Sequence, residues 1–174
     1  WATTALKFPR GDYLILQMIG VLFFGLTIPF SALLADRIGG RHMLIIATLA
    51  IIAFGFTFAW LFGIHDVVRV SAFLALGFSL TGFTYGPLGS TLASLFPTPV
   101  RYTGTSLAFN FAGILGASLA PYLANRLAFD FGVAYVGLYL SAAGLVSLVA
   151  LLMMGGSNKR AIQPARIGVR NGNV

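Results

Sequence analysis

Charged residues divide this chain into long uncharged stretches. The 15 charged residues leave five gaps of 23, 24, 31, 24 and 28 residues, at 13–35, 42–65, 70–100, 102–125 and 131–158. An α-helix needs about 20 apolar residues to cross a hydrocarbon core roughly 30 Å thick. Each gap is long enough for one crossing and too short for two. The pattern predicts five transmembrane helices near 13–34, 43–63, 71–95, 104–124 and 134–154.

The polarity inside these gaps favours helices over strands. The segment LIIATLAIIAFGFTFAWLF (44–62) is apolar on every side, whereas a membrane β-barrel shows segments of about ten residues with alternating polarity. Hydrophobic residues make up 58% of the chain and charged residues 9%, against about 25% charged in soluble domains. The 21 glycines are typical of membrane helices. We therefore expect an all-α integral membrane protein embedded in a lipid bilayer.

Composition also limits the chemistry that the chain can carry. Eleven Lys and Arg against four Asp give a net charge of +7, but nucleic-acid binding needs a basic face on a water-soluble fold. The absence of cysteine excludes disulfides, thiol catalysis and cysteine-based metal sites. The four Asp lie in four separate loops, too scattered for an acidic metal site, and neither His is embedded beside a serine such as Ser90. We expect no catalytic residue, no metal, no cofactor and no nucleic-acid partner.

The distribution of Lys and Arg predicts the orientation in the membrane. Loops 35–42 and 96–103 and the C-terminal tail hold seven basic residues against one Asp. Residues 1–12 and loops 64–70 and 125–133 hold four basic residues against three Asp. The first side is expected to be cytoplasmic, with the C-terminus inside. The basic tail, residues 155–174, is expected to be disordered.

Five crossings with the N-terminus outside would be an unusual topology for a membrane protein. Residues 1–6 (WATTAL) have the character of the last turns of an earlier helix. They do not form the charged region followed by a short apolar core that is expected of a signal peptide. A further helix upstream would restore the parity. We expect the chain to be a piece of a longer protein.

The loop ADRIGGRH (35–42) carries a first motif. A carboxylate ends one predicted helix, a basic residue follows, and two glycines permit a tight reversal. Alone, this is a basic loop with a glycine turn that fixes topology. It also resembles the loop signature of the major facilitator superfamily of transporters, G-x-x-x-D-R-x-G-R-R, with Gly40 standing where a basic residue is usual. The matching positions are Asp36, Arg37, Gly39 and Arg41.

A longer motif, YGPLGSTLASLFPTPVRYTGTSLAFNFAGILGASLAPYLANRL (85–127), is more specific. It resembles the region of the tenth and eleventh helices in the metabolite:proton symporter family, which includes proline/betaine, shikimate, α-ketoglutarate and citrate transporters. Ser94 departs where the family usually has Glu, which removes a carboxylate partner for Arg101. The matching positions are Gly86, Pro87, Phe96, Pro97, Arg101, Tyr102, Thr103, Gly104, Ser106, Asn110, Gly113, Gly116 and Pro121.

The resemblance spans residues 1–157 and implies helices 8–12 of a twelve-helix fold. Residues 1–12 would end helix 7 and form an external loop, and residues 13–154 would be part of the C-terminal six-helix half. It implies symport of a small metabolite (an organic acid, an amino acid or a betaine-like solute) with H⁺ across a bacterial inner membrane, by alternating access. The N-terminal half would be a partner outside this chain.

The resemblance also implies gating contacts at the cytoplasmic end. A carboxylate at a helix end, such as Asp36, can face the positive N-terminus of a helix in the other half. Arg37, Gly39, Arg41 and Arg101 would belong to the same gating region. The alternative is that these residues only fix topology.

Polar residues within the predicted helices are candidates for a substrate path, because polar groups in lipid are costly without partners. Interhelical hydrogen bonding is the alternative role for them. On the implied eighth, tenth and eleventh helices the candidates are Gln17, Thr84, Tyr85 and Asn110. No Asp, Glu, Lys or Arg lies in the middle of a span, so a group that couples transport to protons would lie elsewhere.

Small residues predict where helices approach closely. Gly82-x-x-x-Gly86 and Gly113-x-x-Gly116 each place two glycines near one helix face. Pro87 lacks a backbone N–H and is expected to kink its helix.

Two other functions fit the same pattern of helices. One is a stand-alone five-helix membrane subunit without transport activity, which only the native length of the protein separates from a transporter fragment. The other is a drug or sugar carrier of the same superfamily.

Overall fold

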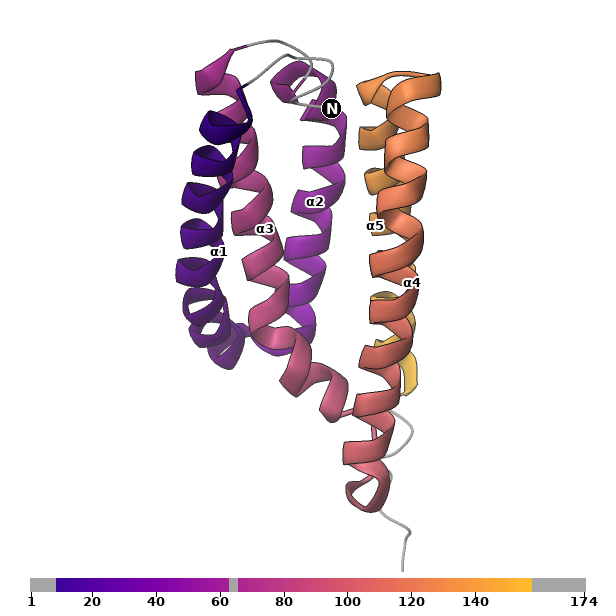
Figure 1. Cartoon of the computed structure of the whole chain (residues 1–174). Coiled ribbons are helices and arrows are strands. Elements are labelled where there is room, and N and C mark those ends of the chain that lie inside the picture. Colours follow the sequence, from indigo (N-terminus) through magenta and orange to yellow (C-terminus); the bar gives the residue numbers. More distant parts are fainter. Residues whose placement is uncertain (1–8, 63–65, 158–174) are drawn as a thin grey trace, which may run out of the picture.

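The structure, a computed structural model, describes residues 9–62 and 66–157, and within them five long α-helices. Residues 1–8, where the end of helix 7 was expected, and the basic tail from residue 158 onward lie outside the described residues. Each long helix is long and apolar enough to cross a membrane, which confirms the all-α membrane fold (Figure 1). The elements are α1 (Arg10–Ile38), α2 (Gly40–Phe62), α3 (Val67–Ala93), the 3₁₀ helix η1 (Thr98–Val100), α4 (Arg101–Asp130) and α5 (Val133–Ser157).

The helices are longer than the uncharged gaps that predicted them. Helix α1, for example, begins at Arg10 and carries Asp12 in its first turn, although residues 1–12 were expected to comprise the end of an earlier helix and an external loop. The uncharged gaps mark only the part of each helix that can lie in the hydrocarbon core of the bilayer. A helix continues into the headgroup region, where charged side chains are solvated.

Local chemistry explains where the helices start and stop. The Asp66 side chain accepts a hydrogen bond of 2.9 Å from the Val68 N–H and caps the start of α3. Gly39, with φ of +91°, ends α1, and Gly132, with φ of +95°, separates α4 from α5. These left-handed conformations are available to glycine without steric cost. Pro87, which was expected to kink its helix, does not end it, because α3 continues to Ala93. Figure 1 shows the last turns of α3 veering toward the start of α4.

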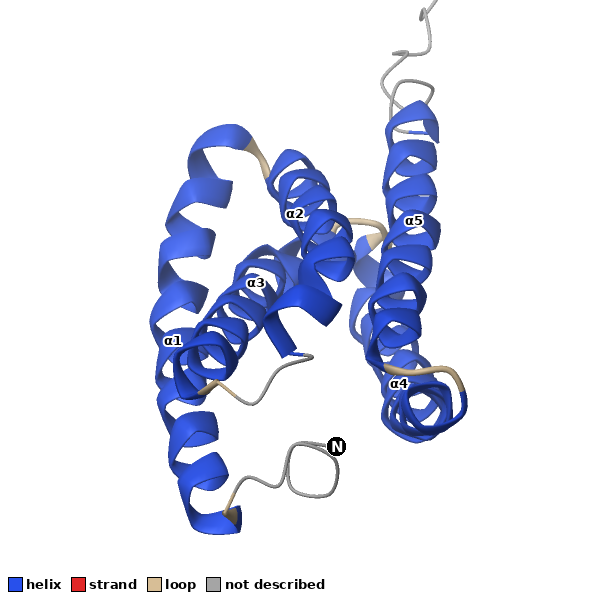
Figure 2. Ribbon diagram, turned by 90° about the horizontal axis from the view of Figure 1, so that it is seen from above, coloured by secondary structure: helices blue, strands red, loops and turns tan. Residues whose placement is uncertain are grey.

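The five helices pack unevenly. Helix α1 lies along α3, and α2 lies along both α5 and α3, whereas α4 contacts α5 and only the end of α3. Figure 2 shows α1 and α4 on opposite sides of the bundle. Within the most apolar 18-residue stretch of α4 no residue is buried. Apolar side chains can remain on the surface of such a bundle because lipid, unlike water, does not drive them inward.

One end of the bundle brings both sequence motifs together. Here α1 ends at Gly39, α2 begins, α3 leads through η1 into α4, and α5 ends. A Cβ on Gly40 would touch the Thr91 side chain of α3, and Arg41 reaches the last turns of α5. We call this end, at the bottom of Figure 1, the motif end.

Candidate substrate path and motif end

Helices α1 and α3 pack closely along a seam at Gly82 and Gly86, next to the candidates Thr84 and Tyr85. A Cβ on Gly82 would lie 2.7 Å from the Phe24 carbonyl oxygen, and one on Gly86 would lie 2.7 Å from the Ile28 carbonyl oxygen. The buried Ser31 hydroxyl donates to the Ile28 carbonyl at 3.1 Å and reaches the Gly82 carbonyl of α3 at 3.4 Å. The two backbones therefore approach as closely as the spacing of Gly82 and Gly86 predicted.

The hydroxyl of Thr84 is used within its own helix. It donates to the Thr81 carbonyl at 2.7 Å, and Thr81 in turn donates to the Gly77 carbonyl at 2.8 Å. Tyr85, on the next position, is 54% exposed. Its ring packs edge-on against Phe24 of α1, with centroids 5.5 Å apart. The Tyr85 hydroxyl makes no hydrogen bond to the described residues.

Asn110 lies exposed on α4, and its amide group is half used. Nδ2 donates to the Ser106 carbonyl at 2.8 Å and approaches the Ser106 hydroxyl at 3.4 Å. The carbonyl oxygen of the Asn110 side chain accepts no hydrogen bond from the described part of the chain. That oxygen is available to a donor on a substrate or on another part of the protein.

Gln17 lies apart from the other candidates. Helices α1 and α3 run parallel, since Gly20 lies beside Phe78 and Thr27 lies beside Gly82. In that register Gln17 is about a dozen residues, roughly 18 Å, from the level of Tyr85. The Gln17 side chain is exposed and has no hydrogen bond within residues 9–62 and 66–157. The structure thus joins Thr84 and Tyr85 but does not close a single site from all four residues.

The second small-residue pair differs from the first. A Cβ on Gly113 or on Gly116 would meet nothing within 4 Å. The close approach predicted for this pair is absent from the described residues, because no helix among them faces that part of α4.

At the motif end, the loop residues divide into free and engaged side chains. Asp36 and Arg37 are exposed and form no ion pair with the described residues. Gly39 makes the turn with its positive φ. Arg41 is half-buried and donates from Nε to the Leu151 carbonyl at 2.8 Å and from Nη2 to the Leu152 carbonyl at 3.0 Å. Arg41 therefore binds the backbone of α5, whereas the resemblance implied that it belongs to the gating region.

Arg101 borders an open, mainly apolar cavity of about 470 Å³ where α3 leads into α4. Its Nε donates to the Phe96 carbonyl at 3.3 Å. The Thr105 hydroxyl is buried and has no hydrogen-bond partner among the described residues. The sequence reasoning missed this cavity, although its residues recur at the spacing of one helix face. The lining residues are Ala93, Thr98, Arg101, Tyr102, Thr105, Ser106 and Phe109.

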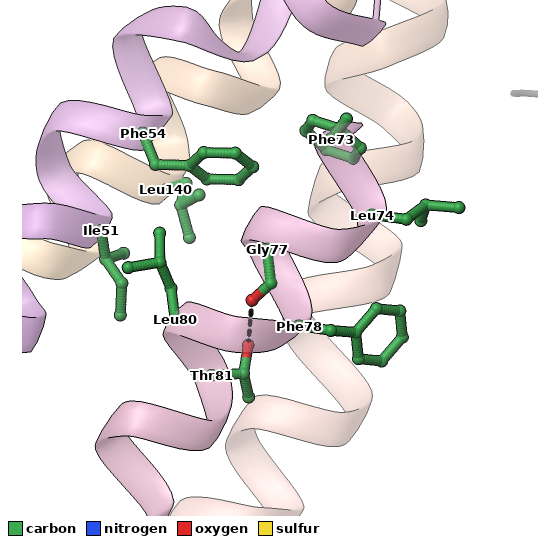
Figure 3. Close-up of a pocket in the computed structure, with 9 residues that line it drawn as sticks. All are labelled: Ile51, Phe54, Phe73, Leu74, Gly77, Phe78, Leu80, Thr81 and Leu140. Atoms are coloured by element: carbon green, nitrogen blue, oxygen red, sulfur yellow. Dashed lines mark hydrogen bonds between the residues drawn. The ribbon is translucent and has the colours of Figure 1, made fainter. Parts of the chain in front are cut away.

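A second cavity, of about 250 Å³, lies between α2, α3 and α5. Figure 3 shows aromatic and aliphatic side chains around it, with the Thr81 hydroxyl turned to the Gly77 carbonyl. No polar group in this wall is left to orient a charged solute, so the cavity does not extend the candidate substrate path. Its lining residues are Ile51, Phe54, Phe73, Leu74, Gly77, Phe78, Leu80, Thr81 and Leu140.

Metal chemistry finds no support in the described residues, where no three His, Asp or Glu side chains gather. Their acidic groups lie at helix ends, as in the pairs of Asp66 with Arg69 at 3.5 Å and Asp130 with Arg126 at 3.4 Å. Both pairs are partly or largely exposed.

Sequence comparison relates the chain to transporters. It is 47% identical over 153 residues to the inner membrane metabolite transport protein YhjE of Escherichia coli, covering 87% of this chain and 35% of that protein. It is 31% identical over 157 residues to a citrate-proton symporter of Salmonella typhi, covering 88% of this chain and 36% of that protein. A proline/betaine transporter of Escherichia coli is 31% identical over 150 residues, or 85% of this chain and 29% of that protein.

The matches extend along nearly all of the chain but only part of each relative. The chain spans about a third of the length of these curated relatives. No protein-family model and no solved structure matches it. The relatives are transporters, not enzymes, and the described part of the chain has five helices able to span a membrane. The chain belongs to the metabolite transporter family of the major facilitator superfamily.

Proposed function

We propose that this chain is part of a secondary active transporter that moves a small metabolite across the inner membrane by proton symport. The solute would be an organic acid, an amino acid or a betaine-like compound, carried by alternating access. The observation that carries the proposal is the 47% identity to an inner membrane metabolite transport protein over 153 residues. The names of the more distant relatives, a citrate-proton symporter and a proline/betaine transporter, support the solute class and the coupling ion.

The chain would supply most of the C-terminal half of the transporter. Its relatives are about three times as long as the matched region, and the remaining length would supply the N-terminal half and one further helix. The bare face of α4 supports this arrangement, because its exposed Asn110 and its open glycines lack a neighbour among the described helices. Polar groups at membrane depth are stable when protein or a water-filled cavity covers them.

The motif end would face the cytoplasm, because it carries the larger number of basic residues. Asp36 and Arg37 have no ion partner within the described ranges, so both are free to form gating contacts with the other half. Arg101, at the first position of α4, would join them. Such contacts must form and break during the cycle, which suits exposed side chains.

Tyr85 and Asn110 are the strongest candidates for the substrate path in this chain. Each is exposed and keeps a hydrogen-bonding atom that is unused within the described residues. Gln17 has the same property nearer the opposite end, and Thr84 would have to exchange its helical bond for a substrate. A titratable group that couples solute to protons would come from outside α1 to α5, since no charged residue lies in the middle of these helices.

The native product would be purified from membranes and its intact mass measured first. A mass corresponding to the length of the relatives supports the transporter. A native product of 18.5 kDa would instead support the alternative, a stand-alone five-helix membrane subunit.

Uptake by the full-length parent in proteoliposomes then tests the site. Proline, glycine betaine and citrate would be offered with and without an imposed pH gradient, which proton symport requires. Asn110→Ala should raise KM about tenfold for the transported solute, because a hydrogen bond to a charged ligand is lost. Asn125→Ala is the matched control, since Asn125 is exposed on the same helix about four turns away. Unchanged kinetics in Asn110→Ala would remove Asn110 from the path.

A further inference from the structure

The contact of Arg41 with α5 joins two helices that are far apart in sequence. The guanidinium of Arg41, at the second position of α2, binds two successive carbonyls, those of Leu151 and Leu152. An arginine fork has parallel donors at fixed spacing, which a lysine ammonium does not have. The geometry uses that property, because Nε binds one carbonyl and Nη2 binds the next.

The end of α5 has chemistry that favours such a cation. The helix stops at Ser157 after two consecutive glycines, Gly155 and Gly156, and glycine weakens a helix because it has more backbone freedom to lose. The Leu151 and Leu152 carbonyls lie within the last two turns of α5, near the negative end of its dipole. Because the helix continues to Ser157, they keep their intrahelical partners four residues on, and the guanidinium donates to them in addition. Positive charge near these carbonyls stabilises the final turns.

Arg41 is also the last in a series of contacts along the α2–α5 pair. The buried Ser141 hydroxyl donates to the Ile52 carbonyl at 3.0 Å. A Cβ on Gly137 would touch the Gly55 carbonyl, and one on Gly144 would lie 2.7 Å from the Ile52 side chain. The two helices run antiparallel in a fixed register, since each step up α2 is matched by a step back along α5.

The join between α1 and α2 has a different character. It consists of Gly39 alone, in a left-handed conformation. A single glycine can absorb a change of backbone angle more readily than the interdigitated α2–α5 seam.

We infer that Arg41 is an interhelical cap for α5, a positioning residue that makes α2 and α5 one rigid unit during the transport cycle. The cap itself stands on the geometry, and its part in transport rests on the proposed function. Arg41 therefore serves the fold of this half and is not one of the gating contacts with the other half.

Hydrogen exchange on the full-length protein in nanodiscs tests the cap without any need for transport. In Arg41→Ala, the amides of the last turn of α5 should exchange about tenfold faster than in the wild type. Arg41→Lys should fall between them, because a lysine keeps the charge but loses the fork. Arg126 is an exposed arginine near the other end of α4. Its replacement in Arg126→Ala should leave the exchange rates of the last turn of α5 unchanged. Wild-type exchange in Arg41→Ala would overturn the cap.

A disulfide tests the rigid unit. The Cβ of Ile52 lies 3.9 Å from a Cβ built on Gly144, which matches the mean of about 3.8 Å in disulfides. In a parent without other cysteines, Ile52→Cys with Gly144→Cys should crosslink on oxidation and keep its uptake rate within about twofold of the reduced form. Uptake blocked by oxidation would show that α2 and α5 slide, and failure to crosslink would contradict the seam.

Uptake kinetics separate positioning from contact with substrate. Arg41→Ala should lower the maximal rate about tenfold and leave KM within about twofold, whereas a raised KM at an unchanged maximal rate would overturn the assignment. If Arg41→Ala fails to fold, two measurements still test the inference. They are hydrogen exchange in Arg41→Lys and the Ile52–Gly144 disulfide in a protein that keeps Arg41. If the wild type transports nothing, the proposed function fails while exchange and crosslinking still report on the cap.

Discussion

The α1–α3 seam and helix α4 carry the same kind of sequence signal with opposite results. Gly82 and Gly86 bring the backbone of α3 against that of α1, with carbonyl oxygens of α1 where side chains would otherwise be. A Cβ on Gly113 or on Gly116 of α4 would meet nothing within 4 Å in the part of the chain that the structure describes. Small residues permit close approach but do not cause it, because a partner helix must be present to use the space.

The two regions also differ in how their polar groups are satisfied. In the seam, the Ser31 hydroxyl is buried and hydrogen-bonded. On α4, the Thr105 hydroxyl is buried without a partner among the described residues, and the Asn110 carbonyl oxygen is unused there. An unsatisfied polar group at membrane depth costs several kcal/mol. The Ser31 hydroxyl of the seam is satisfied by the two helices that form it, whereas these polar groups of α4 have no partner among the described residues.

The largest effect is expected from filling the seam. Gly86→Leu would push a side chain into the Ile28 carbonyl and the Ala32 N–H, at 2.7 and 2.9 Å from a Cβ. Since backbone cannot move aside cheaply, we expect the full-length protein to lose about 3 kcal/mol of unfolding free energy. SDS titration in mixed micelles would measure it. Gly89→Leu, one turn on and with nothing within 4 Å, is the control, and an equal loss there would mean that crowding at the seam is not the cause.

A smaller effect is expected on α4, and it tests whether other parts of the protein cover this helix. In the full-length protein, Gly113→Leu should cost about 2 kcal/mol of unfolding free energy if another helix packs there. The same titration would measure it, with Gly113→Ala as the control for helix propensity. A change under about 0.5 kcal/mol would mean that this face of α4 meets lipid and that the comparison with the seam reflects a real difference in the whole protein.

The sequence predicted the fold well because the bilayer imposes a simple rule. Charged residues cannot stay in hydrocarbon, so the gaps between them locate five helices to within a few residues. The seam at Gly82 and Gly86 was also predictable, since its spacing belongs to one helix. The exact helix ends could not be predicted from the uncharged gaps. Charged residues such as Arg10 and Asp12 can lie within a helix where it passes through the headgroup layer.

Contacts between distant segments were harder to predict. The fork of Arg41 onto the Leu151 carbonyl depends on how α2 and α5 are placed, which no local pattern contains. The motif suggested a gating role for Arg41, because a sequence shows side-chain charges but not the backbone carbonyls that they can bind. The cavity at Thr105 was missed for a similar reason, since a hydroxyl is satisfied or unsatisfied only in a given packing.

The smallest effect is expected in the α2–α5 seam, which has both a close approach and a polar contact. Ser141→Ala removes the hydrogen bond to the Ile52 carbonyl but leaves the helices in contact. Interhelical hydrogen bonds in membranes average about 0.6 kcal/mol, so a loss of about that size is expected in the same titration. Ser147→Ala is a matched control, because the Ser147 hydroxyl bonds at 3.0 Å to the Ala143 carbonyl of its own helix. Equal losses in the two variants would show that the hydrogen bond of Ser141 to the Ile52 carbonyl adds nothing to the stability of the α2–α5 seam.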